Sequence, residues 1–127
     1  MSIIEILKQD YANFPNFQSY DLYAKDVSFN DPLTSFKGVE RYQKMISFLG
    51  SFFSDINLEL HEIKQTNQLI LTEWTLQMVS PLPWKPTITI SGSSELTLND
   101  ELLIISHLDL WKISPWQVLM QNFRFNR

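Results

Sequence analysis

Residues 23–38 read YAKDVSFNDPLTSFKG, and this stretch says most about the fold. Val27 and Phe29 alternate with other residues as they would in a short strand. The strand should end at Asp31-Pro32, because proline has no amide proton for a sheet and restricts the residue before it. Gly38 then opens a long amphipathic pattern. The stretch predicts a strand, a turn with a loop, and a helix, in that order.

Helical spacing predicts helices on both sides of this strand. Ser2 and Glu5 have the spacing of a capping box, and apolar residues follow at helical intervals until Pro15. A second, short helix is expected over about residues 18–23. From Val39 to Phe53 the apolar residues gather on one side of a helix, which is typical of a helix packed against a sheet.

Beyond residue 56 the apolar period becomes an alternation, which indicates strands. In one of them Ile70, Thr72 and Trp74 share a face with Leu76 and Met78. Three prolines within residues 80–86 interrupt the alternation and predict an extended loop. The strands are expected over residues 57–64, 69–79, 87–98 and 102–113.

The end of the chain carries a second capping pattern. Ser114 can cap a helix that starts with Pro115, and Gln117 completes a capping box, so a C-terminal helix is expected. Helices followed by several antiparallel strands indicate an α+β fold, with a curved antiparallel sheet packed on the N-terminal helices. At 127 residues the chain fits one domain over residues 1–127.

Composition argues against several classes of partner. The net charge of −4 argues against binding to nucleic acid or to an anionic membrane, both of which require a basic face. The absence of cysteine excludes disulfides and thiolate metal sites. No signal peptide and no apolar run of about 18 residues is found, so a cytoplasmic protein is expected. The two histidines lack metal-site spacing and the three glycines cannot form a phosphate loop, so we expect no metal and no cofactor.

The last two strands define the candidate site. A two-residue turn at Asn99-Asp100 would set His107 opposite Gly92, whose missing side chain leaves space. Asp109 would then lie opposite Ile90. Directly paired side chains share one face of a sheet. The inner face would therefore collect Ile88, Ile90, Gly92, Leu96 and Leu98 with Leu103, Ile105, His107, Asp109, Trp111 and Ile113.

His107 and Asp109 are the candidate catalytic residues. They would project inward from one strand, separated by roughly 6.5–7 Å along it. A histidine can act as acid, base or hydrogen-bond donor, and a carboxylate can act as base or polar anchor. The alternative is that the pair lies in solvent or makes only structural hydrogen bonds.

Other candidates have two readings each. Asp31 can cap its own turn or lie at the mouth of a pocket, and Phe29 and Trp74 can be core residues or pocket walls. His61 and Glu59 share a face of their strand, but the pattern leaves open whether that face points inward. The predicted ligand-binding residues are Phe29, Asp31, Trp74, Ile90, Gly92 and Trp111.

The quoted stretch, Gly38 and the later sequence ISHLDLW (residues 105–111) resemble the nuclear transport factor 2-like superfamily over nearly the whole chain. Within it the chain is most similar to a family of short uncharacterised proteins from photosynthetic organisms. The resemblance implies a cone-shaped fold around a pocket. Enzymes of the superfamily include ketosteroid isomerases, polyketide cyclases, dehydratases and epoxide hydrolases, and their acid–base residues would correspond here to His107, Asp109 and Asp31. Neither the isomerase's aspartate–tyrosine pattern nor the epoxide hydrolase's Asp-Arg-Asp triad is matched in register, so no single activity carries over.

The resemblance also implies a homodimer through the outer sheet face. Leu102, Ile104, Leu108 and Leu110 would form an apolar stripe there, which a partner chain or the tail helix could cover. Two functions stay open. One is a small-molecule-binding protein, with or without cofactor-free proton transfer. The other is a non-catalytic homodimeric module whose cone is filled by its own side chains.

Overall fold

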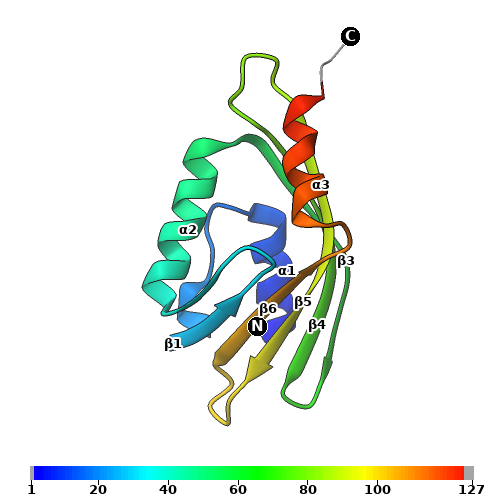
Figure 1. Cartoon of the computed structure of the whole chain (residues 1–127). Helices are drawn as coiled ribbons and strands as arrows, with labels where there is room; N and C mark the ends of the chain where they lie inside the picture. The colour runs from blue at the N-terminus through cyan, green and yellow to red at the C-terminus, as the bar shows by residue number, and fades with distance from the viewer. Residues whose placement is uncertain (1, 125–127) are drawn as a thin grey trace.

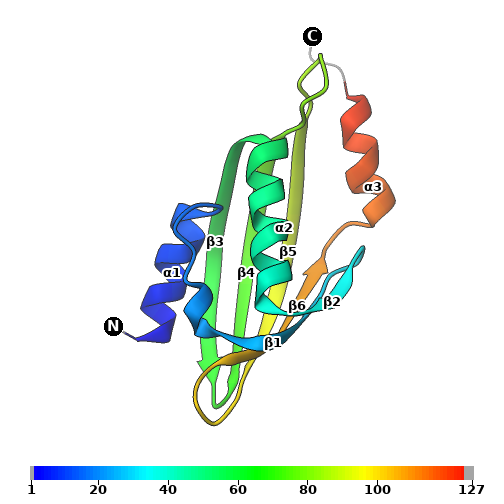
Figure 2. The same ribbon diagram turned by 90° about the vertical axis from the view of Figure 1, so that its left-hand side faces the viewer.

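The computed structural model describes residues 2–124 and has helices packed against a curved, open sheet (Figure 1). The two long helices lie on the same side of the sheet (Figure 2). The helices are α1 (Ile3–Asn13), α2 (Val39–Phe52) and α3 (Pro115–Met120), with 3₁₀ turns at Tyr20–Leu22 and Gln121–Phe123. The strands, in chain order, are β1 (Tyr23–Asn30), β2 (Ser35–Lys37), β3 (Ser54–Thr66), β4 (Leu69–Val79), β5 (Thr87–Leu98) and β6 (Ile104–Trp111).

The sheet has the strand order β2-β1-β6-β5-β4-β3. The predicted α+β class with a curved sheet on the helices is confirmed. The expectation of a wholly antiparallel sheet was wrong, because β1 runs parallel to β6. Alternation of side chains does not distinguish a parallel from an antiparallel neighbour, so the sequence pattern could not reveal this pairing.

Element boundaries agree best where periodicity is long. The strands β4 and β5 have the predicted bounds, and α3 carries the predicted capping box at Ser114 and Gln117. The expected helix over residues 18–23 is only the short 3₁₀ turn Tyr20–Leu22. The segment of β2 was expected to be loop, because its three residues show no apolar alternation. In the structure, backbone pairing to β1 makes it a strand.

The entry to α2 is as the sequence predicted. Gly38 has a φ of 112°, a backbone region that glycine adopts without steric cost. Its amide donates to the carbonyl of Val27, at an N···O distance of 2.9 Å. Gly38 thus turns the chain from the β1–β2 hairpin into the helix that covers the sheet.

The register between β5 and β6 differs from the prediction. The chain turns over Asn99–Leu103, where the Asn99 side chain accepts from the amides of Glu101 and Leu103. His107 consequently pairs with Leu96 and not with Gly92, a shift of four residues (96 − 92). Because four is even, the shift leaves His107 on the same sheet face as before.

A bulge in β6 overturns part of the predicted faces. Ile104 pairs with Leu98 and Ser106 pairs with Thr97, so Ile105 is an extra residue in β6. Ile104 is therefore fully buried and Ile105 is 38% exposed, the reverse of the expectation. Leu102 lies in the turn at 59% exposure. The remaining predicted inner residues Leu103 and Ile113 lie outside β6, which spans Ile104–Trp111.

The inner face of the sheet packs against the helices in separate clusters. Leu7 of α1 packs with inner residues of β4, β5 and β6, and Ile46 of α2 packs with Phe29 of β1. A third cluster occupies the far end of β4 and β5, and Val118 of α3 packs against it. Its buried members are Trp74, Leu76, Met78, Ile88 and Ile90.

Gly92 has a packing role that the sequence did not suggest. It pairs with Trp111, and a Cβ at Gly92 would lie 2.4 Å from the Leu110 carbonyl oxygen and 2.9 Å from the Trp74 ring. The space opposite His107 is therefore not supplied by this glycine. The missing side chain instead lets the Trp74 indole lie against the backbone of β5.

We expect Gly92→Ala to lower the free energy of unfolding by about 1–3 kcal/mol, because the backbone of β6 and a packed indole must both move. Chemical denaturation measures the change. Gly50→Ala is the matched control: Gly50 is exposed in α2 and its new Cβ would meet only Pro15, at 3.3 Å. This control should alter the unfolding free energy by less than about 1 kcal/mol, and equal effects of the two substitutions would contradict the packing role.

Candidate functional site

A cavity of about 600 Å³ lies between the helices and the inner face of the sheet. Residues from α1, α2, α3 and the strands β1, β3, β4, β5 and β6 line it, and most of them are apolar or aromatic. Gly92 does not line the cavity. The other seven predicted site residues do, namely Phe29, Asp31, Trp74, Ile90, His107, Asp109 and Trp111.

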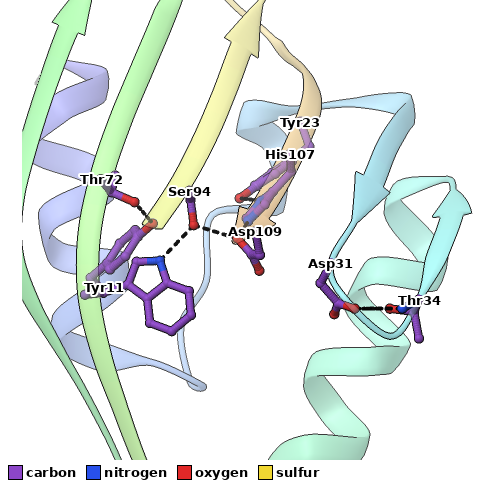
Figure 3. A network of polar contacts seen from close by, with 9 residues as sticks. Tyr11, Tyr23, Asp31, Thr34, Thr72, Ser94, His107 and Asp109 are labelled. Atoms are coloured by element: carbon purple, nitrogen blue, oxygen red, sulfur yellow. Dashed lines mark hydrogen bonds and ion pairs between the residues drawn. The ribbon is translucent and has the colours of Figure 1, made fainter. Parts of the chain in front are cut away.

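His107 and Asp109 form a hydrogen-bonded pair on the inner face of β6 (Figure 3). The Nε2 atom of His107 lies 2.8 Å from Oδ1 of Asp109, and the two side chains are 8% and 19% exposed. Three rings surround the imidazole: Phe29, Tyr42 and Tyr23, with centroids 5.0, 5.5 and 6.2 Å away. The pair is thus held in aromatic surroundings, with the carboxylate the more accessible group.

Two further side chains fix the direction of these hydrogen bonds. The indole Nε1 of Trp74 lies 2.9 Å from Oγ of Ser94, and Ser94 Oγ lies 2.5 Å from Oδ1 of Asp109. An indole N–H can only donate, so the Ser94 hydroxyl accepts a hydrogen bond from Trp74 and donates one to Asp109. The oxygen Oδ1 then accepts from both Ser94 and His107.

Ser94 was missed by the sequence reasoning. It occupies an inner position of β5 opposite Thr72 and is 2% exposed. The sequence did carry a signal. Ile90 and Leu96 are apolar inner residues, and Ser94 interrupts the run between them. Buried hydroxyls usually have a hydrogen-bond partner, so such a break indicates a polar cluster nearby.

Tyrosines from three elements surround the polar cluster, and sequence reasoning missed them as well. The hydroxyl of Tyr11 lies 2.9 Å from Oγ1 of Thr72, and that of Tyr23 lies 3.5 Å from Nδ1 of His107 (Figure 3). A neutral imidazole with its proton on Nε2 satisfies both of its contacts, because Nε2 donates to Asp109 and Nδ1 accepts from Tyr23. Tyr11 comes from α1, Tyr42 from α2 and Tyr23 from β1, so two helices and the strand beside β6 complete the site.

Burial changes the acidity of these groups. Desolvation raises the pKa of Tyr11 to about 12 and the pKa values of Tyr23 and Tyr42 well above 10. Burial also raises the pKa of the Asp10 carboxyl, which lines the cavity from α1 and accepts from the amide and hydroxyl of Ser19. The hydroxyl protons of these tyrosines are therefore retained at neutral pH.

Asp31 caps its own turn and also lies in the cavity lining. Its Oδ1 accepts from the amides of Leu33 and Thr34, at 2.8 and 2.7 Å, and so caps the turn after β1. It also lines the cavity together with the exposed side chain of Leu33. Figure 3 shows Asp31 well apart from Asp109.

His61 and Glu59 lie on the outer face of the sheet. Nε2 of His61 is 2.8 Å from Oγ1 of Thr75, which in turn is 2.9 Å from Oγ of Ser91 on the outer side of β5. Glu59 pairs with Thr75 and is exposed. Within residues 2–124 there is no group of three or more His, Asp or Glu side chains that could hold a metal ion.

The helix α3 lies along the cavity and not on the outer face. Val118 packs on the inner-face cluster, and Trp116 and Leu119 line the cavity while remaining 66% and 51% exposed. Beyond the end of β6, the Gln121 side chain bonds both backbone atoms of Thr89 on β5. The tail helix therefore does not cover the predicted outer stripe, and that alternative was wrong.

Helices around a curved open sheet and an apolar cavity define a known class of fold. Solved structures with this architecture are described as NTF2-like, SnoaL-like or ketosteroid isomerase-like, and the chain has this NTF2-like fold. The family model described as uncharacterized conserved protein (DUF2358) matches residues 1–107, and the chain belongs to this family. No curated protein matches the sequence.

Three solved structures illustrate the likeness. A hypothetical protein from Catenulispora acidiphila with a ketosteroid isomerase-like fold, in complex with trimethylamine, has a TM-score of 0.75 and 16% identity over 92% of this chain and 91% of that chain. A putative SnoaL-like polyketide cyclase from Jannaschia sp. has a TM-score of 0.75 and 11% identity over 93% and 89%. An LEH-like epoxide hydrolase from M. tuberculosis has a TM-score of 0.67 and 14% identity over 96% and 87%. The TM-scores show a common fold, and at such low identities the likeness shows the fold alone.

None of the helices within residues 2–124 is long and apolar enough to cross a membrane.

Burial of the tyrosines predicts how stability depends on pH. All four tyrosines have folded-state pKa values above the ordinary 10.0. A raised pKa contributes stability that is complete below the unfolded pKa and lost as pH rises towards the folded one. We therefore expect the free energy of unfolding to fall above about pH 10, and tyrosinate absorbance in the folded protein to appear at higher pH than in denaturant. Coincident titration curves for the folded and unfolded chain would contradict the burial.

Proposed function

We propose that this protein is a small-molecule-binding domain that holds an apolar ligand in the cavity, with the His107–Asp109 pair as its polar contact. The observation that carries the proposal is the open cavity of about 600 Å³, whose wall is mostly aromatic and aliphatic and includes that pair among a few polar side chains. Ligand sites in proteins are typically concave, about 300–1,000 Å³ in volume, and mostly apolar with a few placed polar groups. The cavity fits this description in size and chemistry.

The alternative of a filled cone receives less support. A non-catalytic module would pack its own side chains into the space between α2 and the inner face, as most protein interiors do. Here Trp74, Trp111 and Phe29 stand around the space and leave it open. Solved structures of the same fold also include proteins described as cyclases and an epoxide hydrolase, which act on small molecules.

Cofactor-free proton transfer is the second candidate. It is supported by the geometry of the carboxylate, whose Oδ1 is fixed by Ser94 and His107 while Oδ2 remains available as a base. In such a step Oδ2 takes a proton from a carbon next to a carbonyl of the ligand. The electron pair of that C–H bond forms a C=C bond while the π pair of the C=O bond moves to oxygen, which gives an enolate, and the proton returns to carbon afterwards.

Homodimerisation through the outer sheet face stays a prediction, with a changed set of residues. Of the predicted stripe, Ile104 is in the core, Leu102 is in a turn and Leu108 lies on the outer face but is half-buried. The exposed apolar side chains on β6 are those of Ile105 and Leu110. Leu110 is 44% exposed, and these two residues support the proposal of a partner on this face.

Filling the cavity should abolish ligand binding without unfolding the protein. Ile90 is 4% exposed and its side chain lines the cavity, so we expect Ile90→Trp to weaken binding of the neutral dye Nile red at least about tenfold. Fluorescence titration measures the affinity and circular dichroism confirms the fold. Leu110→Trp, on the outer face, adds the same ring and should leave the affinity within about twofold. Unchanged binding by Ile90→Trp would place the dye elsewhere and contradict the proposal.

Proton transfer predicts hydrogen exchange in a bound ketone. In D₂O we expect the wild-type protein to exchange the hydrogens next to the carbonyl of 2-decanone faster than buffer, because Asp109 can remove them. Asp109→Asn should reduce the rate to that of buffer, as measured by mass spectrometry of the recovered ketone. Exchange by wild type no faster than buffer would reject catalysis on this ketone while leaving the binding proposal standing.

A further inference from the structure

The geometry points to the chemical class of the ligand: an apolar molecule that carries a protonated amine, whose N–H donates to Oδ2 of Asp109. This inference rests on the proposed function, since it assumes that the cavity binds a small molecule. It adds the charge and the hydrogen-bond direction of the ligand's polar end. Both follow from which atoms in the cavity wall are already engaged.

The first observation is an unengaged carboxylate oxygen next to the imidazole of His107. Oδ1 of Asp109 accepts from Ser94 and from His107, whereas Oδ2 has no hydrogen-bond partner among residues 2–124. Figure 3 shows Oδ2 turned away from both donors. The side chain is 19% exposed and lines the cavity, so a ligand atom can reach this oxygen. Because Oδ1 accepts both hydrogen bonds, Oδ2 is the oxygen left to accept from a ligand.

The second observation is that neighbouring polar groups are occupied by one another. Tyr11 is bonded to Thr72, and Tyr23 faces Nδ1 of His107. Both carboxyl oxygens of Asp10 accept from Ser19. The deep end of the cavity therefore offers a ligand one strong acceptor at Oδ2, which selects for a donor on the ligand.

The third observation is the charge of the wall. Three aspartates line the cavity (Asp10, Asp31 and Asp109), and the described lining residues include no lysine and no arginine. A carboxylate ligand would meet like charge without a compensating cation, which is costly where water is largely excluded. An ammonium group would meet the opposite charge.

The aromatic wall favours a cation as well. Phe29 and Tyr42 lie about 5 Å from the imidazole beside Asp109, with centroids 5.0 and 5.5 Å from that of His107. Trp74 and Trp111 line the same cavity. A ligand cation near the faces of such rings is stabilised by their quadrupoles, by an amount that grows when the site is desolvated. An alcohol of the same shape would form the hydrogen bond to Oδ2 but would lack this attraction.

A matched set of three ligands tests the inference. Decylamine, 1-decanol and decanoate share an apolar chain and differ only in the end group. At neutral pH we expect the wild-type protein to bind decylamine roughly tenfold to a hundredfold more tightly than decanol. Decanoate should bind more weakly than decanol. Isothermal titration calorimetry gives the affinities, and fluorescence of the three cavity-lining tryptophans reports occupancy.

Asp109→Asn should reverse the preference. The amide oxygen of asparagine would remain at the Oδ1 position, because Ser94 and His107 still donate there. The NH₂ group would then face the cavity in place of Oδ2 and present a donor. Decylamine should lose roughly tenfold to a hundredfold in affinity, while decanoate should bind more tightly than to wild type.

Glu59→Gln provides the charge-matched control. It removes one negative charge from an exposed residue on the outer face of the sheet, outside the cavity lining. We expect decylamine affinity to change by less than about threefold. Equal losses in the two variants would show a general charge effect and overturn the assigned contact to Oδ2.

The outcomes separate this inference from the proposed function. Equal affinities for decylamine and decanol, or tighter binding of decanoate by wild type, would overturn the amine class while the cavity remained a binding site. Failure of all three ligands and of Nile red to bind would instead reject the proposed function itself. Stronger decylamine binding that Asp109→Asn reverses would establish both.

Discussion

The position of the Trp74 indole is the constraint on which the candidate site depends. The ring lies against the backbone of β5 because Gly92 has no Cβ, and its N–H can only donate. That donor fixes the orientation of the Ser94 hydroxyl, which then donates its hydrogen bond to Asp109. Asp109 in turn orients His107. One missing side chain on β5 thus determines the direction of hydrogen bonds that run from β4 to β6.

The faces of the strands could be predicted from the sequence, whereas their partners could not. Alternation has a period of two, so an error of four residues in the β5–β6 register left His107 and Asp109 on the inner face. The same alternation failed at Ile104 and Ile105, where a bulge adds one residue and reverses inside and outside. A bulge is set by how two strands and a turn fit together, and Asn99–Leu103 shows no local pattern that would reveal it.

The rest of the site is a tertiary property. Tyr11 of α1 and Tyr42 of α2 meet the polar cluster because the helices pack across the inner face, and Tyr23 meets it because β1 pairs with β6. Helical or strand periodicity places such a residue on an apolar face and says nothing about its partner there. Ser94 and Thr72 were different, since a hydroxyl at an inner position of a strand already indicates a buried hydrogen bond.

The distribution of polar groups inside the cone follows from the cost of burying them. A buried polar atom without a partner destabilises the folded state, so hydroxyls, indole and imidazole in the interior are found bonded to one another at one end. Within residues 2–124 no buried side-chain nitrogen or oxygen lacks a hydrogen-bond partner. Oδ2 of Asp109 makes no hydrogen bond there, and it belongs to a partly exposed side chain that lines the cavity. Open acceptors of this kind are expected at functional sites, where the missing partner comes from outside the protein. The end of the cavity at which a ligand's polar group must lie is therefore set by the same hydrogen-bond geometry that holds β4, β5 and β6 in register.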